Sequence, residues 1–388
     1  DNVDHFVLKE AEITLPAFLE DLAKGEAKPL YQTDEWADIT LSPIPSWNLI
    51  NLKHYASMYL QYSRGCPHDC SFCDITVLYG RTPRTKTEEQ IIAELNSLYN
   101  YGWRGPVFFV DDNFLGNKAK IKESVLPAII KWMDAHKHPF VFNTECTITL
   151  ADDDELMDLM AKAGFISVFV GIESPHEDSL AECGKYTNTN RDLLHSIKKI
   201  QSKGIEIQGG FIVGFDSDPL SIFDKVTNFI QASGIATAMV GLLNAPNGTK
   251  LYNTLKKENR IIKSMSGDNT DWSMNFKPKM NYDTLLQGYA DILSRIYAPK
   301  HYYARVKNFL MIYKPVKKPG HHITRYDISA FIKSIFVLGV VGKERLHYWK
   351  LFFWSAFRHP RLFPQTITLA IYGFHFRKVM EHYISVLS

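Results

Sequence analysis

The sequence predicts an α/β protein built around a partial (β/α)6 barrel, a TIM-like arrangement of six parallel strands and their connecting helices. Three observations favour this fold class. Six strand–helix units of roughly 30 residues follow one another between about residues 58 and 243. Their strands are apolar and their helices amphipathic, which is typical of a parallel sheet whose outer face is covered by helices. Polar residues follow several strands directly, and in such barrels the functional groups lie at the carboxyl ends of the strands.

Residues 1–50 precede these units and follow a different pattern. Val3–Leu8 is predicted as a buried strand, and Leu15–Leu22 as a short amphipathic helix with Gly25 beyond its end. A proline-containing connector, Pro43–Trp47, comes next. Because one strand and one helix cannot form a core of their own, we expect this segment to dock on the rest of the chain or to belong to a further domain.

We assign the predicted barrel to residues 51–284. Its strands are expected at 59–62, 106–110, 140–142, 166–171, 205–215 and 237–243. The helices between them are expected at 87–98, 118–136, 152–163, 191–203 and 220–232. The strands are short and apolar whereas the helices have a polar face, so the two periodicities can be told apart.

Residues 285–388 are predicted to form a separate helical extension that is basic and rich in aromatic residues. From Lys300 to Ser388 the chain has 15 Lys or Arg against 3 Asp or Glu, whereas the rest of the chain has a net charge of about −10. The stretch Tyr348–Arg358 interleaves basic and aromatic residues. This pattern is typical of contact with a membrane surface or an acidic partner. Its aromatic side chains would then lie at the lipid headgroups, among them Trp349, Phe353 and Trp354. The alternative is a helical cap over the barrel mouth.

The cysteine content and the hydropathy restrict the compartment. The chain of 388 residues has 5 cysteines, most of them in one motif, so a disulfide framework is not expected. No run of about 18 apolar residues occurs, so no segment is predicted to span a membrane. We therefore expect a cytoplasmic protein, with residues 301–388 as a peripheral contact to the inner face of the membrane. Nucleic acid is not an expected partner, because no recognisable RNA-binding module is present.

Cys66, Cys70 and Cys73 lie on one short loop with the spacing Cys-x3-Cys-x2-Cys. A [4Fe–4S] cube has four irons, so three thiolate ligands would leave one iron open to a substrate or cofactor. The alternative is a zinc site, which normally needs a fourth Cys or His. His68 lies inside the loop, but no second cysteine pair follows nearby.

Polar residues follow three of the predicted strands. Asp111, Asp112 and Asn113 follow the second strand and supply hydrogen-bond acceptors. Asp and Asn are also ordinary capping residues before a helix, which is the alternative interpretation. Glu173 ends the fourth strand, where a solvated strand end is the alternative. Asn244 follows the sixth strand, within a segment that would bind a ligand through backbone groups or form an ordinary turn.

The fifth strand contains Gly210 and Gly214 on either side of Ile212. Glycines at these positions allow a ligand to approach the backbone closely, although paired glycines also mark a β-bulge. Other polar or sulfur-containing residues near strand ends are expected to be of less importance. We expect surface charges at Glu145 and Lys185, with contact to a cofactor or substrate as the alternative. Cys146 is expected to be a buried small side chain, with a reactive thiol as the alternative, and Cys183 a bystander.

The cysteine spacing, with Phe72 before the last cysteine, resembles that of the radical S-adenosylmethionine (SAM) superfamily. The resemblance implies a [4Fe–4S] cluster on the three cysteines, with SAM chelated to the open iron. It also implies which residues contact SAM: Asp111, Asp112 and Asn113 at its amino group, Glu173 at its ribose, and Phe72, Gly210, Ile212, Gly214 and Asn244 near its adenine. Ser217 stands where the family has Glu.

Longer runs around these motifs resemble the cobalamin-binding-domain subgroup, which includes the hopanoid C-methylases. The runs are Tyr62–Pro67, Phe72–Ile75, Phe109–Phe114 and Gly210–Asp216. Val3–Val7 and Glu10–Glu12 resemble the last strand of that subgroup's N-terminal domain. The resemblance therefore implies that residues 1–50 are the end of a Rossmann-like cobalamin domain plus a linker, and that cobalamin is a further cofactor.

The resemblance implies an enzyme that reductively cleaves SAM to a 5′-deoxyadenosyl radical and abstracts hydrogen from an unactivated carbon. The expected outcome is cobalamin-dependent C-methylation of an apolar or lipid-like small molecule, with an external electron donor of the flavodoxin or ferredoxin type. Two alternatives stay open. One is a radical cyclisation, rearrangement or oxidation without methyl transfer, and the other is an iron–sulfur electron carrier or scaffold.

Overall fold

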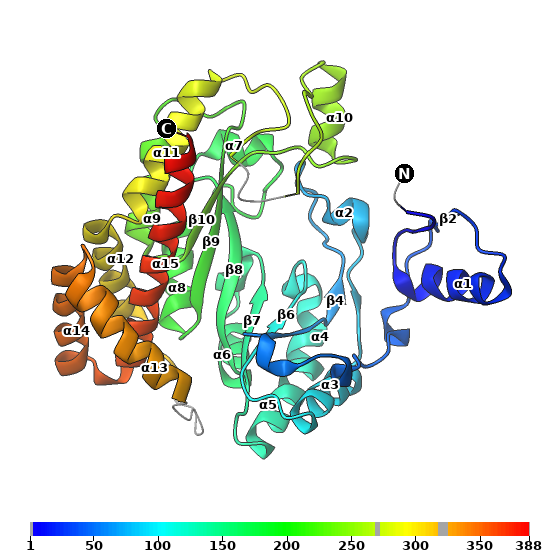
Figure 1. The fold of residues 1–388 in the computed structure, drawn as a ribbon, viewed down its shortest axis with the longest axis horizontal. Helices are drawn as coiled ribbons and strands as arrows, with labels where there is room; N and C mark the ends of the chain where they lie inside the picture. Colours follow the sequence, from blue (N-terminus) through cyan, green and yellow to red (C-terminus); the bar gives the residue numbers. More distant parts are fainter. Residues whose placement is uncertain (1–2, 268–271, 317–324, 388) are drawn as a thin grey trace.

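A six-stranded parallel sheet forms the centre of the computed structural model, which describes residues 3–267, 272–316 and 325–387 (Figure 1). Its strands are β3 Met58–Leu60, β6 Pro106–Phe109, β7 Val141–Glu145, β8 Phe165–Glu173, β9 Glu206–Val213 and β10 Ala238–Leu242. Each strand pairs in parallel with the next strand along the chain, and β3 and β10 are the two edges. The six predicted strands and their parallel pairing are confirmed; closure into a barrel stays a prediction.

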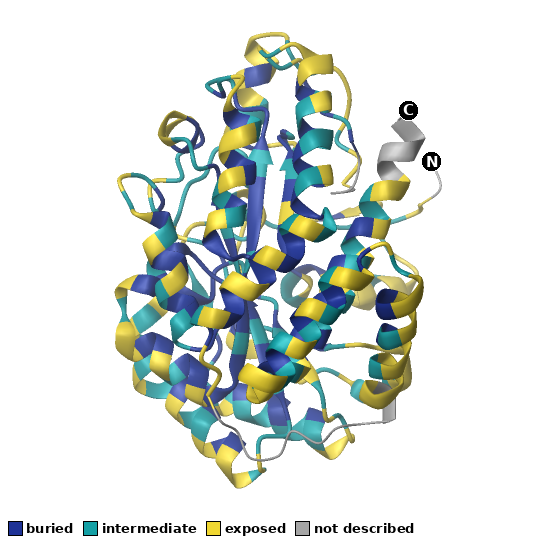
Figure 2. Cartoon of the chain, turned by 90° about the vertical axis from the view of Figure 1, so that its left-hand side faces the viewer, coloured by how far each residue is buried: buried dark blue, intermediate teal, exposed yellow. Residues whose placement is uncertain are grey.

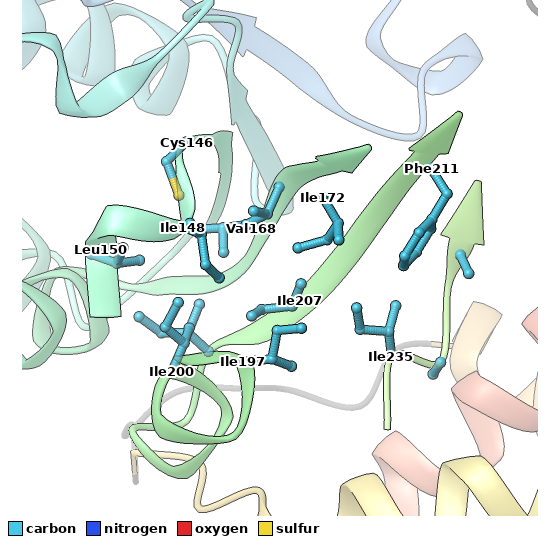
Figure 3. Close-up of a cluster of buried hydrophobic side chains, with 14 of the residues drawn as sticks. Cys146, Ile148, Leu150, Val168, Ile172, Ile197, Ile200, Ile207, Phe211 and Ile235 are labelled. Carbon is cyan, nitrogen blue, oxygen red and sulfur yellow. The ribbon is translucent and has the colours of Figure 1, made fainter. Parts of the chain in front are cut away.

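Helices cover one face of this sheet. They are α3 Glu88–Asn100, α4 Lys118–Lys120, α5 Leu126–Ala135, α6 Asp154–Ala163, α8 Leu193–Ser202 and α9 Ile222–Ser233. Figure 3 shows Ile197 and Ile200 of α8 beside Ile207 of β9, in the buried layer between sheet and helices. The predicted helix 118–136 is interrupted by a π-helical turn, Ile121–Val125. Pro127 lies at the start of α5 and has no N–H for an α-helical bond to the preceding turn.

The opposite, inner face of the sheet has no such helical cover and is partly exposed. Residues paired across parallel strands point to the same face, and two such pairs are Tyr59 with Phe108 and Gly210 with Met239. Tyr59 and Met239 are about half exposed, and a Cβ added at Gly241 would meet no atom within 4 Å. The inner face is therefore open towards the ends of the strands.

The C-terminal extension is helical, as predicted. It contains α11 Tyr282–Ile296, α12 Pro299–Ile312, α13 Arg325–Ser334, a π-helical segment Ile335–Val341, α14 Arg345–Arg358 and α15 Phe363–Leu387. α11 and α12 pack against α9, and α15 packs against α11, α12 and α14. Figure 2 shows that the outward faces of the helices on this side of the molecule are largely exposed.

These helices reach the amino ends of β9 and β10, at the opposite end of the strands from the predicted site. The Tyr297 hydroxyl donates to the carbonyl of Ala238 (2.8 Å), the first residue of β10. The Gln365 side chain donates to Glu206 (2.7 Å), the first residue of β9. The alternative of a cap over the barrel mouth is therefore wrong for α12 to α15. α12 packs against α8 and α9, α13 and α14 pack against other C-terminal helices, and α15 reaches the sheet at the amino end of β9.

The N-terminal segment forms a small parallel β–α–β unit at one side of the molecule (Figure 1). It consists of β1 Phe6–Val7, α1 Ala11–Lys24 and β2 Leu30–Tyr31, and Gly25 ends the helix with a φ of 74°. The predicted buried strand is wrong in one respect, because Phe6 is 52% exposed. A two-stranded pair offers no second layer under which both faces could be buried. The origin of this unit in a cobalamin domain stays a prediction.

None of the helices in the described ranges combines the length and the apolar character that crossing a bilayer requires. The longest of them, α15, packs its buried residues against the other C-terminal helices.

Glu206 generates a prediction about stability. Its side chain is buried where the C-terminal helices meet β9, and its Oε1 atom has no hydrogen-bond partner. Burial raises the pKa of Glu206 to about 7. Because the pKa of Glu206 is raised in the native state, its carboxyl group loses its proton at a lower pH in the unfolded chain. The free energy of unfolding therefore falls as the pH rises from about 4.5 to 7, and it stays lowered above pH 7.

We expect Glu206→Gln to increase the free energy of unfolding by up to about 3 kcal/mol at pH 8 and by much less at pH 5. Urea unfolding at both pH values measures this difference. The exposed Glu123→Gln variant controls for the loss of one negative charge. An equal effect of Glu206→Gln at the two pH values would contradict the assignment.

Candidate functional site

The three cysteines lie on the loop between two short antiparallel strands, β4 Ser63–Arg64 and β5 Arg84–Thr85. This cysteine loop, residues 65–83, is folded back on itself: the amide of Cys66 donates to the carbonyl of Gly80 (3.3 Å), and that of Cys73 to Cys70 (3.1 Å). All three thiols are partly buried. Burial raises the pKa of Cys73 to about 12, and the neighbouring Cys70 and Cys66 add to this rise, so the three thiols lie close enough to interact.

Gly65 allows the tight turn that brings Cys66 into the loop. Its φ is +92°, and an added Cβ would lie 3.0 Å from the carbonyl oxygen of Thr82 and 3.1 Å from that of Gly80. A side chain at this position would therefore clash with backbone and require a rare left-handed conformation. The Gly65 amide donates to Asp112 Oδ2 (3.0 Å), which attaches the turn to the end of β6.

The residues after β6 hold the chain that leads into the cysteine loop. Asp111 Oδ1 accepts from the amides of Tyr62 (2.7 Å) and Ser63 (2.9 Å). Burial raises the pKa of Asp111 to about 7, and its Oδ2 atom is buried with no hydrogen-bond partner. Asn113 caps the following helical turn by accepting from the amide of Leu115 (3.3 Å). The capping alternative is thus confirmed for Asn113, whereas Asp111 and Asp112 bind the backbone of the loop's entry strand.

Glu173, at the end of β8, forms a buried ion pair that the sequence did not predict. Its Oε1 atom accepts from Lys185 Nζ (2.8 Å), and both side chains are largely buried. The expectation of a surface charge at Lys185 is wrong, because the chain after β8 folds back over the strand end. Glu173 has a φ of 62°, and a Cβ at Gly171 would overlap its carboxylate, so a glycine is needed beside it. Backbone strain of this kind is often found at functional sites.

The same strand ends bring Glu145 and the two remaining cysteines towards the site. Glu145 ends β7 and is partly buried; burial and the nearby Asp112 raise its pKa, so the expected surface charge is wrong here too. Cys146 is buried, as predicted. Cys183 is buried against the cysteine loop, where its carbonyl accepts from the amide of Ser71 (2.8 Å).

A cavity of about 310 Å³ lies between the cysteine loop and the chain after β8. Cys70 and Lys185 line it from opposite segments, together with Pro67, His68, Asp69, Arg81, Gly184, Tyr186 and Thr187. The Lys185 ammonium opposes the effect of burial on the pKa values of Cys66 and Cys70. The cavity therefore combines a thiol and a cation beside the predicted acceptor Glu173. Phe72 lies next to this region, with its ring 6.5 Å from that of Phe215.

The remaining predicted residues follow β9 and β10. Gly210 lies on the inner face against the ring of Phe169, since an added Cβ would be 2.7 Å from it, and Ile212 lies on the same face. Gly214 has a φ of +106°, and its amide donates to Asp218 (2.8 Å), a residue that sequence reasoning missed. Ser217, at the position where the resemblance implies a Glu, donates to Glu182 (2.6 Å).

Asn244 is engaged in structural contacts. Its Oδ1 atom accepts from the amide of Asn275 (2.9 Å), and the Asn275 side chain in turn binds both backbone groups of Ala245 (2.9 and 2.7 Å). The polar backbone groups of Ala245 are thus already paired, which at this residue favours the ordinary turn over ligand binding through the backbone. Asn275 lies 30 residues further along the chain, and no local pattern indicates the contact.

The donor set fits an iron–sulfur cube. Within the described ranges no three Cys, His, Asp or Glu side chains lie close enough together to hold a single metal ion. A zinc site needs its ligands around one ion at about 2.0–2.3 Å, whereas a cube binds each thiolate to a different iron. The three thiols of the cysteine loop are the type of donor that a cube binds, and they lie near enough to one another for Cys66 and Cys70 to raise the pKa of Cys73.

Comparison with known proteins agrees with this assignment. The sequence profile of the Radical SAM superfamily matches residues 60–230, and that of a domain of unknown function (DUF4070) matches residues 249–386. An uncharacterized methyltransferase of Synechocystis sp. is 39% identical over 381 residues, which are 97% of this chain and 71% of the relative. A hopanoid C-2 methylase of Rhodopseudomonas palustris is 33% identical over 338 residues, which are 85% of this chain and 63% of the relative.

Among solved structures, the cobalamin-dependent SAM radical enzyme OxsB with aqua-cobalamin bound has a TM-score of 0.56 at 15% identity. The match covers 97% of this chain and 67% of that chain. At this identity the likeness shows a common fold. The chain thus spans roughly two thirds of the length of these relatives.

The Glu173–Lys185 pair generates a prediction about stability. Removing one partner of a buried ion pair leaves the other charge without compensation, which costs about 3–5 kcal/mol. We therefore expect Lys185→Met to lower the free energy of unfolding by about this amount at pH 7, as measured with urea. The exposed pair of Lys24 and Glu20 is the matched control, and Lys24→Met should cost at most about 1 kcal/mol.

Adding Glu173→Gln to Lys185→Met should recover most of the loss, because the uncompensated charge is then removed. If Lys185→Met costs no more than Lys24→Met, the pair is not a buried one in solution.

Proposed function

This chain belongs to the radical SAM superfamily, and we propose on that basis that it is a cobalamin-dependent C-methyltransferase acting on an apolar or lipid-like small molecule. The observation that supports it most is the three-cysteine loop, which lies over the carboxyl ends of the strands beside the buried Glu173–Lys185 pair. Two relatives at 39% and 33% identity are named as a methyltransferase and a hopanoid C-2 methylase.

Cys66, Cys70 and Cys73 would hold the cluster, and SAM would lie in front of Glu173 and Lys185. When bound, the two groups supply radical chemistry, which acts on carbon that has no acidic proton. A flavodoxin- or ferredoxin-type protein would serve as the external electron donor. Cobalamin is proposed as a further cofactor because the structural neighbour OxsB is a cobalamin-dependent enzyme with aqua-cobalamin bound.

The residues of this chain would bind and orient SAM. Lys185 provides a buried ammonium group suited to an anionic group such as a carboxylate. Glu173 provides an acceptor for hydroxyl groups, and its strained backbone holds it at the strand end. Asp112 would have two roles. Its Oδ2 atom accepts from the amide of Gly65, and its carboxylate would also accept from the amino group of SAM. Gly210 leaves room on the inner face of β9 beside the ring of Phe169, where an added Cβ would be 2.7 Å from that ring.

The inner face of the sheet supports an apolar substrate. Phe108, Phe169, Ile212 and Met239 lie on it and are partly exposed, beside the polar residues Asn143 and Gln208. Apolar and aromatic side chains with few polar groups are typical of small-molecule sites. We therefore propose that the carbon to be methylated binds in front of β8 to β10, close to the strand ends.

The cluster is tested by anaerobic reconstitution, which should give about four irons and four sulfides per chain. Replacing Cys66, Cys70 and Cys73 together with Ala should abolish both, whereas Cys146→Ala should retain them because this buried thiol is not part of the cysteine loop. With a strong reductant, the intact protein should release 5′-deoxyadenosine from SAM. A triple variant that still binds the cluster would overturn the proposal.

Methyl transfer is separated from other radical outcomes by the products. A cobalamin-dependent methylase uses SAM in two ways, so S-adenosylhomocysteine should form beside 5′-deoxyadenosine, and cobalamin should co-purify or bind. Formation of 5′-deoxyadenosine alone, without cobalamin binding, would instead favour a cyclisation, rearrangement or oxidation.

We further propose that the C-terminal helices contact a membrane surface. Four apolar residues at intervals of four, Ile328, Ile332, Phe336 and Val340, are exposed along α13 and the π-helical segment. α14 adds three exposed apolar residues, Leu346, Phe353 and Phe357. The exposed basic residues of the same region are Lys333, Lys343, Arg345, Lys350 and Arg358. A continuous apolar stripe flanked by Lys and Arg is typical of helices that lie on anionic bilayers.

Two of the aromatic residues expected at the headgroups are instead partly buried. Trp349 donates to the carbonyl of Gly339 (2.9 Å), and Trp354 contacts His359 and lies under the ammonium group of Lys307. Phe353 is half exposed, as that expectation requires. The apolar surface is thus provided by α13, the π-helical segment and the exposed residues Leu346, Phe353 and Phe357 of α14.

Sedimentation with vesicles tests this contact. We expect the protein to bind anionic vesicles at low salt and to bind less at high salt, because each Lys or Arg near the surface contributes about 1 kcal/mol. Ile332→Asp with Phe336→Asp should reduce binding several-fold, since these side chains are 60% and 63% exposed. Leu220→Asp, at 70% exposure before α9, is the matched control. Protein that stays in the supernatant under all conditions would contradict the proposal.

A further inference from the structure

Two arginines face each other at the base of the cysteine loop. Arg64 and Arg84 are direct partners in the antiparallel ladder of β4 and β5, which closes the loop of residues 65–83. Like charges directly opposite each other in a ladder are destabilising. Both side chains are largely buried, so water does little to screen their repulsion. The ladder therefore needs negative charge from another part of the chain.

Glu10 and Glu12, at the start of α1, supply that charge. Glu12 binds the Arg64 guanidinium through both oxygens (2.8 and 2.9 Å). Glu10 binds Arg84 through both oxygens (2.7 and 2.8 Å) and also reaches Arg64 (3.5 Å). The Glu10 side chain is only 1% exposed, and the hydrogen bonds from Arg64 lower the pKa of Glu12 to about 2. Two-point pairs of this kind fix orientation as well as charge.

The same N-terminal segment makes two further contacts here, through Ala37 to Arg84 and through Trp36 to Gly80. The Ala37 carbonyl accepts from Arg84 (2.6 Å), and the Ala37 amide donates to Glu10 (2.5 Å). The ring of Trp36 lies against Gly80, where an added Cβ would be 3.1 Å from the indole. Gly80 in turn accepts the hydrogen bond from the amide of Cys66. The N-terminal segment thus contacts both sides of the turn that carries the first cysteine.

We propose that Glu10 and Glu12 are positioning residues that hold the cysteine loop, through Arg64 and Arg84, in the geometry that retains the cluster. Docking of the N-terminal β–α–β unit and retention of the cluster are then coupled events. The inference rests on the proposed function in one respect, namely that the loop binds an iron–sulfur cluster. It goes beyond that function because neither glutamate touches the cysteines.

The test compares Glu12→Gln, Glu10→Gln and wild type after anaerobic reconstitution. Release of iron to a coloured chelator should be roughly tenfold faster in both variants, because a charge-assisted two-point contact is lost. The electron paramagnetic resonance spectrum of the reduced cluster should also change its response to added SAM. Glu20→Gln is the matched control on the same helix, since Glu20 pairs only with the exposed Lys24 among the described residues, and it should behave like wild type.

A double-mutant cycle distinguishes positioning from general stabilisation. Glu12→Gln and Arg64→Gln should be non-additive in the rate of iron release, because each removes the same contact. Unfolding of the cluster-free proteins is measured alongside. A lower unfolding temperature with a wild-type rate of iron release would overturn the inference, as would wild-type rates in both glutamate variants.

If Glu10→Gln does not fold, Glu12→Gln decides the question alone, because Glu12 is the less buried of the two. If the wild-type protein itself binds no iron, the proposed function fails together with this inference. A wild-type protein that holds its cluster and glutamate variants that hold it equally well would overturn the positioning role alone.

Discussion

The site depends on one constraint: the backbone N–H groups of the chain that follows the edge strand β3 need hydrogen-bond acceptors outside the sheet. β3 is an edge, so the chain beyond Leu60 has no ladder on one side, and its N–H groups need other acceptors. Asp111 and Asp112, at the end of the neighbouring strand β6, accept from Tyr62, Ser63 and Gly65. The cysteine loop is thereby attached to the strand ends that carry Glu145 and Glu173. The two aspartates thus hold the chain between the edge strand and the cysteine loop in one conformation.

Buried ion pairs near the cysteine loop join parts of the chain that are distant in the sequence. Glu173 pairs with Lys185 at the end of β8, and Glu10 pairs with Arg84 at the base of the loop. Desolvation makes such pairs a weak source of net stability, but leaving one partner alone is costly. Their effect is therefore to select one arrangement of the segments. In this arrangement the cysteine loop, the end of β8 and the N-terminal unit lie next to one another.

The two ends of the sheet have different tasks. At the carboxyl ends, loops and buried polar groups surround the cavity beside Cys70. At the amino ends of β9 and β10, the C-terminal helices are joined through Gln365 and Tyr297. Because those helices pack at the far end and over α8 and α9, they leave the inner face near the cysteines open. The apolar stripe on α13 thus lies on a part of the molecule distinct from the cysteine loop.

The sequence by itself determined the elements and the chemistry of the loop. Alternation of apolar strands with amphipathic helices predicts the parallel sheet, because this periodicity is local. The spacing of Cys66, Cys70 and Cys73 predicts a cluster site for the same reason. Only the tertiary structure decided which charges are buried: Lys185 was expected at the surface, and Asn275 was not expected at all. Their partners come from segments that meet only when the strands assemble, so no local pattern could indicate them. The position of the C-terminal helices was likewise decided by packing, since their composition suits a cap over the mouth as well as a support at the opposite end.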